Sequence, residues 1–293
     1  MYIYMTDYMP RLVTIHLMGG LGNQLFQIAT AYAYAKDNGL ELALPSSWLD
    51  RVDRPPLWNS YLDISKWKNI IQEDYYHNAP WLIISEADFE FKPIPVPPNH
   101  AWLCKLFGYF QSSLYFSKYT DELRVLLQPS PLLVAESQTN LKDACIEDYD
   151  SWIVSHVRRG DYVNYSDYHL VCSPQYYKGA KILIEKRSGV KKVCWITDDF
   201  DWVHSNLYTY GDVILSGDSS VDFTNLTQFR HMILSNSSYS WWACWLNPRD
   251  YKDRIICCPN RWFGSSGPSK YETIYEPSWL RIDTISGNLD AHE

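Results

Sequence analysis

The N-terminal part of the chain alternates between short apolar runs and a longer stretch with helical spacing. Residues 12–18 (LVTIHLM) are apolar and rich in β-branched side chains, which predicts a buried strand. After a glycine-rich turn, Leu25 and Ile28 begin an apolar spacing typical of a helix, and Gly39 stands where a C-cap glycine ends one. Residues 41–44 predict a second strand. This order opens an α/β unit whose helix N-terminus can hold an anion.

The second half of the chain repeats this alternation. Stretches with helical spacing or capping residues predict helices at 173–186, 222–230 and 241–247. Apolar runs predict strands at 152–157, 192–197, 213–216, 232–234 and 255–258. Alternating strands and helices in both halves predict two parallel α/β sheets facing a cleft.

The pattern is weaker between these parts. Prolines mark loops from 45 to about 100, after which residues 101–116 predict a strand and loop, and 117–127 a helix. The polar stretch 135–150 is the predicted boundary. Two domains are therefore expected, residues 1–145 and 146–293.

Composition narrows the class of protein. Hydrophobic residues make up 46% of the 293 residues, which excludes a disordered chain. The net charge is −8, whereas proteins that bind a nucleic-acid duplex are usually basic, so no nucleic-acid partner is expected. No apolar run approaches the roughly 18 residues of a transmembrane helix. Seven cysteines without a C-x-x-C pair favour free thiols, and no signal-peptide pattern opens the chain, so a cytoplasmic location is expected.

Three segments carry candidate chemistry, and the first is the turn at 19–24 (GGLGNQ). Gly20 and Gly22 fit part of the G-x-G-x-x-G dinucleotide fingerprint, while Leu25 replaces its third glycine. A tight turn between strand and helix explains this segment equally well.

The second segment, 156–162 (HVRRGDY), follows a predicted strand at the edge where open α/β sheets bind ligands. In an extended strand His156 and Arg158 point to one face and Arg159 to the other. One guanidinium can then enter the cleft, where its planar fork suits a diphosphate, while its neighbour pairs with a carboxylate such as Asp161. A purely structural Arg–Asp brace is the alternative, mainly for Arg159 and Asp161.

The third segment, 235–240 (SNSSYS), precedes Trp241 and Trp242 at a predicted helix start. Its hydroxyls and the unpaired N–H groups of a helix N-terminus suit an anion. A plain N-cap is the alternative.

Together the segments resemble glycosyltransferase family 11, the α-1,2-fucosyltransferases, along most of the chain. The resemblance rests on GGLGNQLFQIATAYAYA near the N-terminus, GYFQS at 108–112, HVRRGDYV at 156–163 and DFTNLTQFRHMILSNSSYSWWACWLN at 222–247. Thr197 stands where relatives usually carry Ser, and Phe110 where Trp is common. These departures concern acceptor choice more than the reaction.

The resemblance implies a GT-B-like enzyme with two Rossmann-type domains, an N-terminal one on the acceptor side and a C-terminal one that binds GDP-L-fucose. It implies transfer of L-fucose with inversion, without a required metal or other cofactor. The acceptor partner is expected to be an oligosaccharide or glycoconjugate, and the acceptor group O2 of a galactose. A fucosyltransferase for another acceptor sugar is the alternative.

Carried over residue by residue, the resemblance implies three catalytic candidates. Arg158 is expected at the β-phosphate, His156 beside the nucleotide, and Asn23 at the reacting centre, by similarity to protein O-fucosyltransferases that share G-x-x-G-N-Q. Asp222 is expected to accept hydrogen bonds from guanine, and Ser237 and Ser238 to bind phosphate. The full expected nucleotide-binding set is Gly20, Gly22, Asn23, Gln24, His156, Arg158, Asp199, Asp222, Ser237 and Ser238.

Three other interpretations explain less. D-x-D triplets at 148–150 and 199–201 suggest a metal site, but Arg158 already supplies a cation. A Rossmann oxidoreductase, for which Glu41 lies at the distance of a ribose ligand, leaves the second and third segments unexplained. A non-catalytic sugar-binding protein would use the aromatic residues, 16% of the chain, yet it does not explain the paired arginines, and most of these rings are expected in the core.

Overall fold

The structure is a computed structural model that describes residues 11–45, 61–63, 66–67, 70–71, 78–248 and 252–290. Its contacts divide the chain into two compact units. The first is Met1–Leu127 with Glu272–Ile274, and the second is Gln128–Tyr271 with Tyr275–Glu293. Both units are α/β with parallel sheets, as the alternation of strands and helices predicted.

The division falls after Leu127 rather than after residue 145. The reason is helix α5 (Pro131–Asp143), which packs on α8 (Ser219–Leu226) of the second unit. Ser137 Oγ donates to Asn225 Oδ1 at 2.7 Å, and Asn225 Nδ2 donates to Asn140 Oδ1 at 2.8 Å. These polar contacts, the first of them buried, make α5 part of the second unit, although its sequence is polar enough to suggest a linker.

In the first unit the described residues form a four-stranded sheet of order β2-β1-β6-β5, with every neighbouring pair parallel. Its strands are β1 (Leu12–Ile15), β2 (Glu41–Leu42), β5 (Leu82–Ser85) and β6 (Leu103–Phe107). A separate parallel pair joins β3 (Leu44–Pro45) to β4 (Ile70–Ile71). Strand β5 lies in the region where prolines had predicted only loops.

Helix α1 (Leu21–Asn38) connects β1 to β2 and supplies much of the first unit's core. Leu25 and Ile28 are fully buried, as their spacing predicted, and Gly39 ends the helix in the left-handed conformation at φ 60°. After β6 the chain makes two short 3-10 turns, η2 (Ser113–Tyr115) and η3 (Ser117–Tyr119), and then α4 (Thr120–Leu126). Helix α4 matches the helix expected at 117–127.

In the second unit the described residues form a six-stranded sheet of order β12-β11-β10-β7-β8-β9, again with every neighbouring pair parallel. The strands are β7 (Trp152–Val157), β8 (Lys192–Thr197), β9 (Val213–Leu215), β10 (His231–Ile233), β11 (Ile256–Pro259) and β12 (Leu280–Ile282). Counted along the unit, this is the doubly wound order 3-2-1-4-5-6. The sheet therefore has its topological switch point between β7 and β10.

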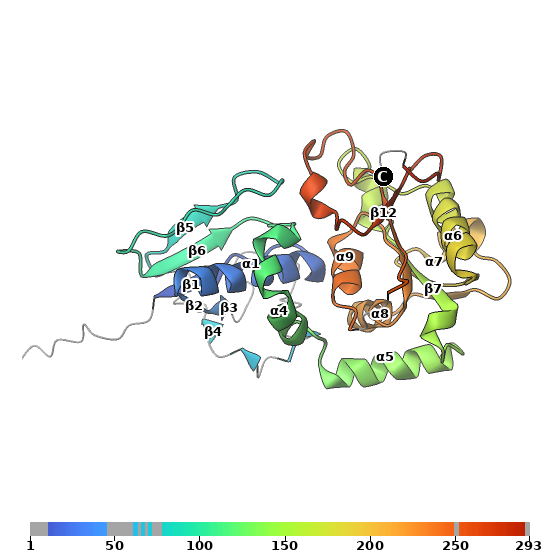
Figure 1. Cartoon of the computed structure of the whole chain (residues 1–293), viewed down its shortest axis with the longest axis horizontal. Helices are drawn as coiled ribbons and strands as arrows, with labels where there is room; N and C mark the ends of the chain where they lie inside the picture. Colours follow the sequence, from blue (N-terminus) through green and yellow to red (C-terminus); the bar gives the residue numbers. More distant parts are fainter. Residues whose placement is uncertain are drawn as a thin grey trace, which may run out of the picture. The chain divides into compact units, whose positions relative to one another are not determined.

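Helices cover both faces of this sheet. Helices α6 (Pro174–Ser188) and α7 (Phe200–Asn206) lie on one side, and α8 and α9 (Ser238–Trp245) lie on the other (Figure 1). Ser173 caps α6 through a hydrogen bond from the N–H of Tyr176, and a proline occupies its first turn, as the sequence predicted. Short 3-10 turns complete the unit at η4 (Tyr149–Ser151) and η5 (Asp161–Tyr165), while η6 (Glu272–Ile274) belongs to the first unit.

Aromatic side chains fill much of the second unit's interior. Trp195, Trp241 and Trp242 are at most 1% exposed, and Tyr176 is fully buried with its hydroxyl donating to the carbonyl of Leu234 at 2.5 Å. Much of the aromatic surplus is therefore core, as expected. None of the helices within the described ranges is long and apolar enough to cross a membrane.

Candidate functional site

The second and third sequence segments meet at the switch point of the second unit. Arg158 follows the carboxyl end of β7, and residues 235–238 follow β10, the neighbouring strand. His156 Nδ1 lies 2.8 Å from Ser235 Oγ, so one buried hydrogen bond joins the two segments directly. Open parallel sheets bind ligands at this place, because the loops on either side of a switch point diverge and leave a crevice.

His156 is buried and neutral. It is 6% exposed, and its ring centroid lies 5.0 Å from that of Tyr239. Burial, reinforced by the nearby Arg158 guanidinium, lowers the pKa of His156 to about 3. The imidazole therefore acts as an uncharged hydrogen-bonding group that holds Ser235, and it carries no proton to donate as an acid near neutral pH.

Arg158 makes ion pairs with two carboxylates. Its Nη2 donates to Asp161 Oδ1 at 2.5 Å, its Nη1 donates to Asp198, and the guanidinium carbon lies 5.2 Å from the Tyr162 ring centroid. The sequence had suggested Asp161 as a partner of Arg159, and this was wrong. Gly160 and the 3-10 turn η5 bend the chain after β7, which returns Asp161 to Arg158 three residues earlier.

Arg159 is the structural member of the arginine pair. Its Nε donates to Asp199 Oδ2 at 2.9 Å, and its guanidinium carbon stacks 4.0 Å from the ring centroid of Trp202. Asp199 also caps α7, because its Oδ1 accepts from the N–H of Trp202 at 3.2 Å. Asp199, expected in the nucleotide-binding set, thus braces the loop after β8 in this structure.

The start of α9 is a rigid turn with hydroxyl groups. Ser237 is the N-cap, its Oγ accepting from the N–H of Tyr239 at 3.3 Å, and Ser238 is the first helical residue. Asn236 is buried and donates through Nδ2 to the carbonyls of Leu170 and Trp262, at 2.7 and 2.9 Å. The third segment is therefore an N-cap, and the same geometry directs the helix's first N–H groups toward the switch point.

Asp222 lines a pocket of about 750 Å³ on the same unit. The pocket borders the carboxyl end of β9 and includes Phe200, Leu215 and Asp218 among its lining residues. Asp222 is 8% exposed, and its Oδ2 accepts from the N–H of Gly217 at 2.9 Å. Burial raises the pKa of Asp222 above its usual value. The sequence did not predict this pocket, because its walls come from helices and loops distant in the chain.

The first sequence segment lies in the first unit, at the turn between β1 and α1. Gln24 is fully buried and its Nε2 donates to the carbonyl of Gly19 at 3.1 Å, so in this structure it supports the turn. Gly22 is also buried, whereas Gly20 is the half-buried N-cap. Asn23 Oδ1 accepts from Gln111 Nε2 at 2.7 Å. Gln111 belongs to a motif noted in the sequence, but nothing there showed that it contacts Asn23.

The two D-x-D triplets start short helices. Asp148 Oδ1 accepts from the N–H of Asp150 at the start of η4, and Asp199 caps α7 as described above. Within the described ranges, no group of three or more His, Cys, Asp or Glu side chains is arranged to hold a metal ion. Capping explains these triplets, and the absence of a metal requirement stays a prediction.

The second unit has a doubly wound sheet with an arginine and a helix N-terminus at its switch point, and the first is also a parallel α/β unit. Two such units are the architecture of the GT-B class of glycosyltransferases. Comparison with known proteins gives the family. The sequence profile described as "Glycosyl transferase family 11" matches residues 1–283. The chain belongs to glycosyl transferase family 11 and is a glycosyltransferase of the fucosyltransferase type.

Individual relatives are distant but cover most of the chain. "O-antigen biosynthesis glycosyltransferase WbnK" of Escherichia coli is 27% identical, covering 91% of this chain and 99% of that protein. "Alpha-1,2-colitosyltransferase" of Escherichia coli is 24% identical, with 93% and 99% covered. "Galactoside alpha-(1,2)-fucosyltransferase 2" of Oryctolagus cuniculus is 25% identical, with 85% and 71% covered.

Two solved structures share the fold. Fucosyltransferase NodZ from Bradyrhizobium aligns with a TM-score of 0.56 at 16% identity, covering 90% of this chain and 98% of that one. POFUT1 in complex with GDP aligns with a TM-score of 0.52 at 11% identity, covering 86% and 99%.

The Gly19 turn leads to a paired prediction about stability. Gly19 has φ +72°, and a Cβ there would lie 2.2 Å from Asn23 Nδ2, whereas a Cβ on Gly20 would meet no atom within 4 Å. Gly19→Ala should cost about 1–3 kcal/mol of stability. Gly20→Ala should lower Tm less, because it introduces no clash and only replaces glycine by the less favourable alanine at the N-cap of α1. Thermal unfolding of both variants checks this, and equal Tm values would contradict the turn geometry.

His156 leads to a prediction about pH. Its pKa of about 3 lies below the unfolded value, so its contribution to stability is full above about pH 6.5 and is lost as pH falls toward 3. Between pH 7 and 5 the wild type should lose about 2 kcal/mol that His156→Gln does not lose. Denaturant titrations at both pH values measure this difference. His204→Gln, at an exposed position, is the control, and identical pH dependence in all three proteins would contradict a buried neutral His156.

Proposed function

We propose that the protein transfers L-fucose from GDP-L-fucose, with inversion, to O2 of a galactose in an acceptor glycan. The observation that carries this proposal is the hydrogen bond between His156 and Ser235, which places Arg158 and the N-terminus of α9 at one switch point. The donor assignment is also supported by NodZ, an α-1,6-fucosyltransferase whose crystal was soaked with GDP-fucose, and by POFUT1, solved with GDP.

The diphosphate is assigned to Arg158, Ser237 and Ser238. A guanidinium forks onto two phosphate oxygens and keeps its charge at every relevant pH. The first N–H groups of α9 and the serine hydroxyls add donors that need no counterion. Phosphate bound to Arg158 competes with Asp161 and Asp198, which hold the guanidinium in the free protein. These carboxylates therefore keep the guanidinium positioned before the donor arrives.

The guanine base is assigned to the pocket beside Asp222. Guanine presents its N1–H and its exocyclic amino group on one edge, and a carboxylate accepts from both. Asp222 Oδ2 already accepts from Gly217, so Oδ1 has the larger capacity to accept from a base. Phe200 and Leu215 supply apolar surface for the ring.

The reaction proceeds by attack of the acceptor hydroxyl oxygen on C1 of fucose, opposite the bond to GDP. That bond breaks with its electron pair going to the β-phosphate oxygen. The acceptor hydroxyl releases its proton to solvent water as the new bond forms. Charge grows on GDP while the sugar becomes oxocarbenium-like. Arg158 and the α9 N–H groups stabilise this charge most as it develops, so no metal is needed in this proposal. Asn23 is proposed to contact the reacting sugar.

The acceptor and linkage rest on the relatives. The matched curated proteins include a galactoside α-(1,2)-fucosyltransferase and an α-1,2-colitosyltransferase, whose names both specify a 1,2 linkage. Their agreement on linkage supports O2 as the acceptor atom. These relatives are equally consistent with an acceptor galactose in a free oligosaccharide and with one in a larger glycoconjugate.

Incubation with GDP-fucose and a panel of β-galactosides and other sugars tests the proposal. We expect a fucosylated galactoside, NMR showing an α-1,2 linkage, and the same yield in the presence of EDTA. Product only on a non-galactose sugar would contradict the acceptor assignment. Loss of turnover with EDTA would contradict the metal-free mechanism, and absence of any product would contradict the donor assignment.

Replacing Asp222 should weaken binding of the guanine base and not that of the diphosphate. Asp222→Ala should weaken GDP binding by about 1–3 kcal/mol and leave pyrophosphate binding unchanged, because only the base loses a partner. Isothermal titration measures both. Asp148→Ala is the matched control, since Asp148 is also a capping aspartate, accepting from the N–H of Asp150, and it does not line the pocket. Equal losses for GDP and pyrophosphate in Asp222→Ala would show a structural role instead.

Lysine substitutions at the two adjacent arginines should distinguish a catalytic role from a structural one. Arg158→Lys should lower kcat by roughly 10²-fold with little change in Tm, because lysine keeps the charge but not the fork, and partly exposed ion pairs contribute little stability. Arg159→Lys should lower Tm through loss of the stack on Trp202, with a much smaller change in kcat. Steady-state kinetics and thermal unfolding on the same preparations decide this. A stable, fully active Arg158→Lys enzyme would remove Arg158 from the catalytic group.

A further inference from the structure

One wall of the pocket beside Asp222 is formed by helix α5, which packs along α8 within the second unit (Figure 1). The residues of α5 that line the pocket are Ala135, Glu136, Thr139, Asn140 and Asp143. Asp222 itself lies on α8. A base that binds to Asp222 therefore also meets α5, and the groups that α5 presents help to decide which base fits.

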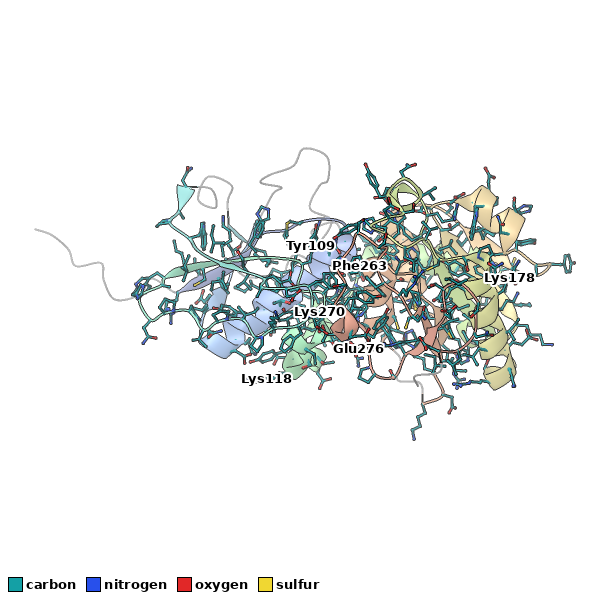
Figure 2. All side chains as sticks on the ribbon, turned by 90° about the horizontal axis from the view of Figure 1, so that it is seen from above. Tyr109, Lys118, Lys178, Phe263, Lys270 and Glu276 are labelled. Carbon is teal, nitrogen blue, oxygen red and sulfur yellow. The ribbon has the colours of Figure 1, made fainter. Side chains whose placement is uncertain are left out.

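The described residues that line this pocket are rich in hydrogen-bond acceptors. Four carry carboxylates, namely Glu136, Asp143, Asp218 and Asp222, and none is a lysine or an arginine. Lys178, labelled in Figure 2, lies on α6, which covers the other face of the sheet from α8. Carboxylates suit the N–H groups of guanine at N1 and at its exocyclic amino group. The neighbouring O6 of guanine is an acceptor, so it requires a donor from the protein.

The side chain of Asn140 supplies such a donor. Its Oδ1 accepts from Asn225 Nδ2 at 2.8 Å, so the carbonyl side of the Asn140 amide is used inside the protein. Its Nδ2 has no hydrogen-bond partner among the residues that the structure describes. Asn140 is exposed and lines the pocket, so its amino group is the polar atom that remains to bind a ligand there.

Two buried side chains fix the direction of the Asn140 amide. Ser137 and Asn225 are both fully buried, and Ser137 Oγ donates to Asn225 Oδ1 at 2.7 Å. Because the Asn225 carbonyl accepts from Ser137, its amino group is the side that faces Asn140, and an amino group only donates. If the Asn140 amide turned over, two amino groups would meet. The Asn140 amino group therefore faces away from Asn225.

We propose that Asn140 is a second base-recognition residue of this pocket and donates from Nδ2 to O6 of guanine. Asp222 accepts from the N1–H and the exocyclic amino group on the same edge of the base. Adenine carries an amino group at position 6 and no hydrogen on N1, so it would place a donor against Asn140 and a lone pair against Asp222. This inference rests on the proposed function, in which guanine binds beside Asp222, and adds the residue that selects guanine over adenine.

Asn140→Asp tests the proposal with almost no change of shape. The carboxylate still accepts from Asn225, so Tm should stay near wild type, while the group that faces the pocket changes from a donor to an acceptor. GDP and inosine diphosphate (IDP), which both carry O6, should bind roughly tenfold to hundredfold more weakly in isothermal titration. ADP should bind at least as well as it does to the wild type, because the carboxylate accepts from its amino group. Pyrophosphate binding should be unchanged.

Gln138→Glu is the matched control for the added charge. Gln138 is an exposed residue of the same helix and does not line the pocket. This variant should leave the affinities for GDP, IDP, ADP and pyrophosphate at their wild-type values. Uniform losses in this variant and in Asn140→Asp would assign the effect to charge and overturn the role of Asn140.

Asn140→Ala keeps the test decisive if the new charge destabilises the protein. Alanine is the better helix former, and this variant removes the donor without adding charge. GDP and IDP should bind roughly threefold to tenfold more weakly, and the ratio of GDP to ADP affinity should fall. With GDP-fucose as the donor substrate, KM should rise at nearly constant kcat in both Asn140 variants, because the base is held equally in the ground state and the transition state.

The outcomes separate this inference from the function on which it rests. A wild type that binds GDP, with an unchanged ratio of GDP to ADP affinity in both Asn140 variants, would overturn the role of Asn140 alone. Equal losses for GDP, IDP and ADP would do the same, because they would show a structural effect. A wild type that does not bind GDP or transfer fucose would contradict the proposed function itself, and the role of Asn140 with it.

Discussion

The hydrogen bond between His156 and Ser235 is the contact on which the second unit's site depends. It joins the carboxyl ends of β7 and β10, the two strands that flank the topological switch point. The bond is short and buried, and the imidazole is uncharged because burial disfavours its protonated form. A charged His156 would require a counterion in the core. Because the ring is neutral, the Arg158 guanidinium can lie near it without charge repulsion, and α9 can begin at the same edge of the sheet.

In each unit, side-chain contacts hold the residues that follow the first strand in place without a ligand. The chemical groups that make these contacts differ between the two units. In the second unit Asp161 and Asp198 hold the Arg158 guanidinium, and Asp199 with Trp202 holds Arg159. In the first unit the neutral amides of Gln24 and Gln111 bond the turn that carries Asn23, and the half-buried Glu86 carboxylate accepts from the backbone of the loop before Gln111. Charged groups suit a site proposed for a diphosphate, and neutral donors suit one proposed for a sugar. Such preorganisation lowers the reorganisation that a reaction requires.

The sequence predicted the local features of this protein well and the long-range ones poorly. The strand, glycine turn and helix at the N-terminus follow from apolar spacing and a C-cap glycine, and the motifs after β7 and β10 were both placed at strand ends. The partner of Asp161 was wrong, because a 3-10 turn after Gly160 reverses the chain in a way that spacing does not reveal. The place of α5, the pocket beside Asp222 and the contact between Gln111 and Asn23 depend on packing between distant segments.

Amide hydrogen exchange with and without GDP would show whether the switch point of the second unit binds the nucleotide. Slower exchange on GDP binding is expected in three segments of that unit, residues 158–161, 235–240 and 216–222. Metal chelation should leave this protection unchanged. Protection confined to residues 19–27 of the first unit, with none after β7 or β10, would contradict nucleotide binding at this switch point.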